Sequence, residues 1–156
     1  MSNQPRKATF DCNIYAQALL NPLGPAGACL QAAFDGRVKL FISDFVLAEI
    51  REIPNKPTPR KAGVTVQKAE SLIALLIDCA EQIAVPPPVL VHPIDADDSH
   101  YVNLSLAADA QLIVSRDRHL LNLNNPTKPW SADFRAQHPL LRVVCPEVLL
   151  VDIRQK

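Results

Sequence analysis

Four carboxylates stand where short apolar runs end or where helix-like segments begin. Asp11 directly follows one apolar run, and Asp117 follows the run at residues 112–114 after two intervening residues. Glu49 lies in the helix-like segment after another run, and Asp98 opens a further one. Carboxylates that converge repel one another, so such a cluster persists only with a compensating cation. Oxygen ligands without a histidine or cysteine cluster suit Mg²⁺ or Mn²⁺, bound together with substrate phosphate.

The elements that must position these acids alternate between strands and helices. Short β-type runs predict about five strands, at residues 8–10, 38–42, 82–85, 112–114 and 141–144. Amphipathic or capped segments predict helices at residues 43–52, 66–80 and 99–108, and two further helical pieces within 14–35 around a turn at 21–25. Strands joined by helical crossovers predict an α/β fold with a parallel sheet covered on both faces. The carboxyl ends of its strands are then the expected place for the four acids.

Proline and polar residues mark the expected connections. With 14 prolines and 4 glycines, turns are expected to be made by proline and by capped helix ends. Residues 54–59 and 86–93 are expected to be proline-rich connectors, and residues 122–134 a polar loop that carries Trp130. The apolar stripe of residues 66–80 is most simply part of the core, and a dimer face is the second interpretation.

Length and composition favour one domain spanning residues 1–156, because 156 residues that are 48% hydrophobic suffice for one core. The 16 basic and 16 acidic residues give a formal net charge of zero. Any phosphate-containing partner must therefore be held by a local patch or a metal. The 4 cysteines lie far apart, so we expect small buried side chains in a reducing compartment. No apolar run suits a signal region or a membrane span, which predicts a soluble, cytoplasmic protein with no membrane partner.

Four segments, in this order along the chain, together resemble the PIN-domain ribonucleases, in particular the VapC-like toxin components of bacterial toxin–antitoxin pairs. The resemblance runs from Phe10 to about Leu121. Its pieces are Asp11-Cys12-Asn13, the pattern Ser-x-x-x-Leu-x-Glu-Ile at residues 43–50, the helix at residues 98–108, and Val114-Ser115-Arg116-Asp117 followed by Leu120-Leu121. The sequence departs from the family at Cys12, where threonine is common, and at His119, where many relatives carry another acid.

The resemblance implies a three-layer α/β/α domain with a central, roughly five-stranded parallel sheet. It further implies an Mg²⁺- or Mn²⁺-dependent endoribonuclease that hydrolyses RNA phosphodiester bonds. The catalytic and metal-binding residues would be Asp11, Glu49, Asp98 and Asp117, with Asn13 and Ser115 supporting them by hydrogen bonds. We place Ser43, Asp95 and Asp97 around that site; Asp95 and Asp97 are either exposed or next to the ligands, and Asp97 competes with Asp98 for the ligand role. The implied partners are an RNA substrate, a small antitoxin protein and, as a further option, a second copy of the chain. Single-stranded or loop RNA is the expected substrate, because unstacked segments can enter a narrow acidic crevice that a stiff duplex cannot.

Basic and histidine side chains have weaker signals. Six cationic side chains could line the crevice and contact RNA phosphates, although scattered charges are more often simply solvated: Arg51, Lys56, Arg60, Lys61, Arg116 and Arg118. Four histidines lack metal-ligand spacing and are expected at surface or turn positions: His92, His100, His119 and His138.

Each acid also has a structural alternative, because aspartate at a helix start satisfies free N–H groups without any metal. A PIN-like module that binds RNA or protein without cutting is the alternative function. The full set of acids counts against it, since a non-catalytic module has no physical reason to keep unpaired charge. A phosphatase of the haloacid-dehalogenase type would need an acid at Asn13, and dinucleotide binding would need a glycine-rich turn after the first strand.

Overall fold

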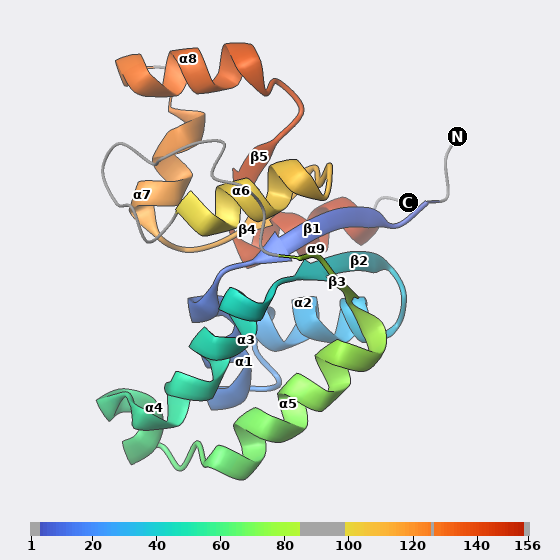
Figure 1. The fold of residues 1–156 in the computed structure, drawn as a ribbon, viewed down its shortest axis with the longest axis vertical. Helices are drawn as coiled ribbons and strands as arrows, with labels where there is room; N and C mark the ends of the chain where they lie inside the picture. Colours follow the sequence, from blue (N-terminus) through green and yellow to red (C-terminus); the bar gives the residue numbers. More distant parts are fainter. Residues whose placement is uncertain (1–3, 85–98, 126, 155–156) are drawn as a thin grey trace.

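The computed structural model of this chain describes residues 4–84, 99–125 and 127–154. Within these residues, strands form one all-parallel sheet in the order β3-β2-β1-β4-β5 (Figure 1). Their bounds are β1 (Arg6–Phe10), β2 (Val38–Ile42), β3 (Glu81–Gln82), β4 (Leu112–Val114) and β5 (Arg142–Val144). The predicted α/β fold with a five-stranded parallel sheet is confirmed.

Helices fill the connections between these strands, as parallel pairing requires. The helices before β3 in the chain are α1 (Cys12–Leu20), α2 (Pro25–Phe34), α3 (Asp44–Glu52), η1 (Ile53–Asn55), α4 (Pro57–Lys61) and α5 (Val66–Cys79). The remaining helices are α6 (Ser99–Ala107), α7 (Arg118–Leu121), η3 (Asn122–Asn124), α8 (Pro129–Gln137) and α9 (Pro146–Arg154). None of the helices in the described residues combines the length and the apolar character that crossing a bilayer requires.

Alternating residues of β4 face two separate hydrophobic clusters, which is the period of a strand buried on both faces. Leu112 and Val114 belong to the larger cluster, with side chains of α1, α2, α5 and α9. Ile113 belongs to the smaller cluster, with side chains of α6, α7 and α8. The sheet is therefore the middle of three layers.

Strand β1 lies at the centre, paired with β2 on one side and β4 on the other. The chain adds β2 and β3 in one direction and returns to add β4 and β5 in the other. The ends of β1 and β4 thus form the topological switch point, where parallel sheets open a crevice. Phe10 and Val114 are register partners at that end, so the residues that follow them are neighbours.

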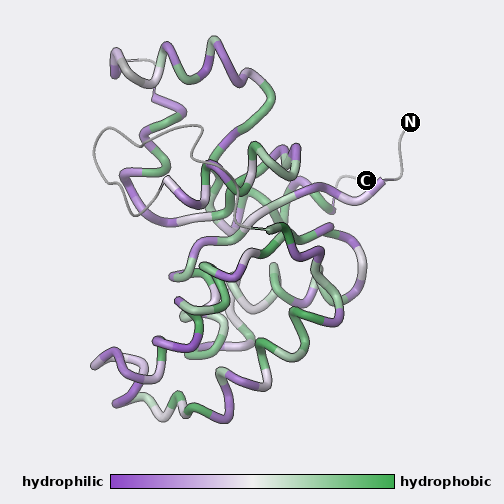
Figure 2. The backbone as a smooth tube through the Cα atoms, in the orientation of Figure 1, coloured by the Kyte–Doolittle hydropathy of each residue, from purple (hydrophilic) through white to green (hydrophobic). Residues whose placement is uncertain are grey.

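The predicted helix at residues 66–80 is confirmed as α5, but only part of its apolar stripe is core. Leu72, Ile73 and Leu76 are buried, whereas Val66, Leu75 and Ile77 are more than half exposed. Figure 2 shows hydrophobic residues along α5, while the neighbouring α4 is largely hydrophilic. The outer part of the stripe leaves the dimer-face interpretation open.

Three expectations about local structure are wrong. Residues 122–134 are not a polar loop but contain η3 and most of α8, which begins at Pro129 because proline fits the first helical turn. The connector at residues 54–59 is likewise largely helical, with Pro57 opening α4. Cys79 is exposed and Cys145 is partly exposed, so only two of the four free cysteines are the buried hydrophobes expected.

Candidate active site

Asp11 and Asp117 meet at the carboxyl ends of β1 and β4, joined by the side chain of Ser115. The Ser115 hydroxyl donates a short hydrogen bond to Asp11 Oδ2. The Ser115 Oγ atom in turn accepts from the backbone N–H of Asp117 at 2.9 Å. The register of β1 on β4 positions this group, since the Asp11 backbone N–H donates to the Val114 carbonyl at 3.1 Å. Two carboxylates predicted from separate segments are thus brought to one edge of the sheet.

Asp11 is an almost buried carboxylate with few partners for its charge. Asp11 is only 4% exposed, and its Oδ1 atom accepts from the Ile14 N–H at 3.1 Å. Burial raises the pKa of Asp11 to about 6; the Ser115 hydrogen bond opposes this shift, and the Asp117 charge adds to it. A carboxylate left ionised in this position raises the free energy of the folded state, and a bound cation would offset that cost.

Both aspartates also cap helices, as the structural alternative expects. Asp11 is the N-cap of α1, and Asp117 Oδ1 accepts from the His119 N–H at 2.8 Å at the start of α7. Capping by Asp117 involves only one of its two oxygens. The side chain of Asp117 remains 28% exposed. Capping and cation binding are therefore compatible at this residue.

Glu49 lies in the middle of α3, and its carboxylate is held by two residues of α6. The Tyr101 hydroxyl donates a short hydrogen bond to Glu49 Oε1, and His100 Nε2 lies 3.0 Å from the same oxygen in a close electrostatic contact without good hydrogen-bond geometry. Partial burial raises the pKa of Glu49, but the contacts with His100 and Tyr101 outweigh it and hold the pKa below its usual value. Glu49 is therefore ionised at neutral pH.

Tyr101 connects Glu49 to the start of α1. Its hydroxyl accepts from the backbone N–H of Cys12 at 2.8 Å, so one buried oxygen bridges α3 and the residue next to Asp11. Burial raises the pKa of Tyr101, and the charge of Glu49 raises it further, so the hydroxyl keeps its proton. The Tyr101 backbone is fixed in turn, because Ser105 Oγ donates to its carbonyl at 2.8 Å and lies 2.7 Å from Thr9 Oγ1 of β1.

The Tyr101→Phe variant is expected to lower the melting temperature by about 2 to 12 °C. The change leaves the buried Cys12 N–H without its acceptor, a cost of about 1 to 3 kcal/mol, and each kcal/mol shifts a domain of this size by roughly 2 to 4 °C. Thermal melts followed by circular dichroism measure the shift. The matched control is Tyr15→Phe, because the buried Tyr15 hydroxyl has no hydrogen-bond partner among the described residues. Equal melting temperatures for the two variants would contradict the bridging role of Tyr101.

The structure also describes two other predicted site residues, Asn13 and Ser43. Asn13 is exposed on the first turn of α1, where its backbone N–H lowers the pKa of Asp11. Ser43 is buried and caps α3, with Oγ accepting from the Val46 N–H at 3.3 Å. The predictions at Asp95, Asp97 and Asp98 lie outside the described residues. In the part of the chain that the structure describes, no three histidine, cysteine or acidic residues are close enough together to hold a metal by themselves.

The candidate RNA-contact residues fall into two groups. Arg51 pairs with Glu70 of α5 at 3.3 Å, and Arg116 pairs with Glu147 of α9 at 2.7 Å. The others are exposed: Lys56, Arg60, Lys61 and Arg118. Contact with RNA remains a prediction for all six.

The expectation for His100 is wrong, and sequence reasoning missed both His100 and Tyr101. The side chain of His100 is only 16% exposed and lies between the rings of Phe45 and Tyr101, with ring centroids 4.0 and 3.8 Å away. A signal was present, since both residues come directly after the predicted start of the helix at residues 98–108. His119 and His138 are partly exposed, and His92 lies outside the described residues.

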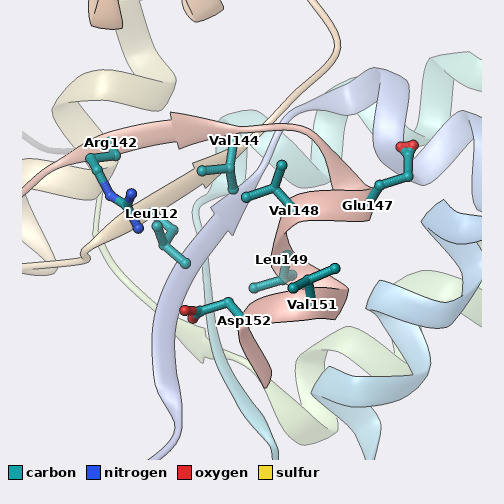
Figure 3. A pocket seen from close by; sticks show the side chains of 8 residues that line it. All are labelled: Leu112, Arg142, Val144, Glu147, Val148, Leu149, Val151 and Asp152. Carbon is teal, nitrogen blue, oxygen red and sulfur yellow. The ribbon is translucent and has the colours of Figure 1, made fainter. Parts of the chain in front are cut away.

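A separate hollow of about 380 Å³ lies between β4, β5 and α9 (Figure 3). Figure 3 shows the side chains that line it, among them Val144, Val148, Val151, Arg142 and Asp152. None of the three candidate acids that the structure describes, Asp11, Glu49 and Asp117, lines it. The crevice at Asp11 and this hollow are therefore different features.

The chain belongs to the PIN domain family, whose model matches residues 7–119. That range contains all four candidate acids. PIN domains are generally nucleases. No curated protein sequence matches the chain.

A solved structure supports the same fold. The chain is similar to the crystal structure of VapBC2 from Rickettsia felis bound to a DNA fragment from their promoter, with a TM-score of 0.51 and 14% sequence identity. The match covers 89% of this chain and 98% of that chain. At this identity the likeness shows the fold.

Proposed function

We propose that this protein is a divalent-metal-dependent endoribonuclease and the toxin of a toxin–antitoxin pair. The observation that carries the proposal is the group formed by Asp11, Ser115 and Asp117 at the switch point of the sheet, where a buried carboxylate lies beside a second acid. A crevice at the carboxyl ends of parallel strands is where such folds act on ligands. Membership of the PIN domain family supports a nuclease.

The donor set fits Mg²⁺ or Mn²⁺. Both are hard cations that take oxygen ligands, and Mg²⁺ usually binds through one or two carboxylates plus water and substrate phosphate. Asp11 and Asp117 would hold the ion, with Glu49 and Asp98 completing the set. When bound, the ion would neutralise the scissile phosphodiester and make a water molecule a better nucleophile.

The protein's own side chains would prepare this chemistry. Ser115 fixes the orientation of Asp11 by its hydrogen bond, and its oxygen also fixes the backbone of Asp117. Glu49, ionised and held by Tyr101, would orient the attacking water or accept its proton. Single-stranded RNA is the proposed substrate, because unstacked segments enter a narrow crevice that a stiff duplex cannot.

The proposed partner is a small antitoxin protein, as in the VapBC2 complex named above. An arginine of such a partner would pair with two carboxylates at once and block the crevice. We further propose a cytoplasmic location, where RNA is the available substrate.

The test is cleavage of single-stranded RNA by the purified protein with Mn²⁺, with EDTA, and with Mn²⁺ restored. We expect cleavage only when the ion is present, and Asp117→Asn should lower the rate about 100-fold or more, since it removes several kcal/mol of charge stabilisation. The control is Asp109→Asn, which removes the same charge from the turn before β4, at the opposite end of that strand, and keeps a residue suited to the positive φ of 54°. Cleavage in EDTA, or an Asp117→Asn rate equal to that of the control, would contradict a metal-dependent site at Asp117, and no cleavage with Mn²⁺ would favour the non-catalytic module.

A further inference from the structure

Phe45 presents a large aromatic surface to solvent next to the candidate site. It lies in the first turn of α3 and is 48% exposed. Its ring lies on that of His100, with centroids 4.0 Å apart and planes inclined by 39°. Because His100 contacts Glu49 at 3.0 Å, a single side chain separates this exposed ring from a candidate catalytic carboxylate.

The same ring forms a wall of a hollow of about 300 Å³, lined by Phe45, Ala48, Glu49, Glu52 and Lys56. This volume is at the lower end of the range for ligand pockets. It carries two carboxylates and one ammonium: Lys56 acts electrostatically on Glu49 and lowers its pKa, and the Glu52 carboxylate accepts from the Asn55 amide at 2.9 Å.

These charges disfavour a phosphate inside the hollow, because it would meet two carboxylates. A flat, uncharged group with a polarisable face avoids this repulsion and can stack on the exposed face of Phe45. Nucleobases have this character, and stacking on an aromatic side chain is a main source of single-strand binding energy.

We propose that this hollow, the Phe45 hollow, binds an unstacked nucleobase of single-stranded RNA, with Phe45 as the stacking surface and Lys56 contacting a neighbouring phosphate. The inference rests on the proposed function for the identity of the ligand as RNA. It assigns that site a base-binding position beside Glu49. The base would lie next to the nucleotide whose phosphodiester is cut.

The experiment measures binding in EDTA, without cleavage, using fluorescence anisotropy of two probes: oligoadenylate RNA and a fully abasic phosphodiester oligomer of the same length. The quantity of interest is the ratio of the two dissociation constants. In Phe45→Leu this preference for the base-bearing probe should fall about 10-fold, the effect expected for one stacked base. In Phe45→Trp it should be retained or increased. The exposed apolar control, Leu140→Ala at the loop before β5, should leave it unchanged.

A second variant separates phosphate from base. Lys56→Gln should weaken both probes by a similar factor and lessen the salt dependence of binding, leaving the ratio unchanged. An unchanged ratio in Phe45→Leu overturns the inference. So does a Phe45→Leu variant that binds both probes as the wild type does and loses binding only to a protein partner. If the ratio responds as expected but the wild type cleaves no RNA with Mn²⁺, the proposed function fails and the base-binding position stands.

Discussion

Replacing Asp11 by asparagine is expected to abolish RNA cleavage and at the same time stabilise the metal-free protein. The rate should fall at least about 1,000-fold, because an amide binds a divalent cation far more weakly than a carboxylate and several kcal/mol of charge stabilisation are lost. The metal-free melting temperature should rise by about 6 to 12 °C. The reason is that a carboxylate whose pKa is raised from 3.8 to about 6 carries a cost of about 3 kcal/mol when ionised.

Asparagine keeps the capping contact of Asp11, while its NH₂ group would take the place of Oδ2 and donate to the Ser115 oxygen instead of accepting from it. It is nearly isosteric, it caps helices as well as aspartate does, and its oxygen can still accept from the Ile14 N–H. Cleavage assays with Mn²⁺ and melts in EDTA measure the two effects, with Asp109→Asn as the control that changes net charge equally. A lower melting temperature for Asp11→Asn would mean that the charge of Asp11 stabilises the fold as a cap, and the convergent site would lose its main support.

The metal-free protein should also be more stable at pH 5 than at pH 7. Between the unfolded pKa of 3.8 and the folded value of about 6, the folded protein binds more protons at Asp11 than the unfolded chain does. The free energy of unfolding therefore rises as the pH falls through 6. One unit below the folded pKa the gain is about 1.4 kcal/mol, or roughly 3 to 6 °C.

The pH range in which the stability gain from Asp11 can be measured alone ends near pH 4.5, because Glu49, whose pKa is lowered from its ordinary 4.5, also begins to affect stability there. The stability that Glu49 contributes is present above pH 4.5 and is lost as the pH falls through its lowered folded value. Melts in EDTA at pH 7 and pH 5 measure the effect, and Asp11→Asn isolates it. A difference between the two pH values that persists unchanged in Asp11→Asn would assign the effect to another group.

The sheet and the position of Asp11 could be predicted from the sequence because both follow from local patterns. Apolar runs bounded by helical segments define the parallel strands, and an acid directly after a central strand can only lie at the carboxyl edge. Asp117 was predictable for the same reason. Those patterns are properties of neighbouring residues in the chain, so no tertiary information is needed.

The contacts around Glu49 could not be predicted in this way. The Tyr101 hydroxyl bonds to Glu49 across 52 positions of the chain, and this hydrogen bond joins α6 to α3. His100 precedes Tyr101 in the same helix. A histidine without ligand spacing gives no sign of such a partner. The helix α8 was missed because its composition is polar. Its buried side chains find their partners only in the fold: Ser131 donates to the Leu123 carbonyl at 2.5 Å, and Phe134 joins the smaller hydrophobic cluster.

The central position of β1 has a consequence for the time at which the crevice first exists during synthesis. Ser115 bonds to Asp11 across 104 positions of the chain, and β4 pairs with a strand made about a hundred residues earlier. Contacts of such long sequence separation close late in folding, because the loop between them must be ordered first. A nascent chain on the ribosome can pair β1 with β2 early, yet it has no completed crevice until β4 has emerged. The protein is therefore synthesised, over most of its length, as a chain without its proposed nuclease site.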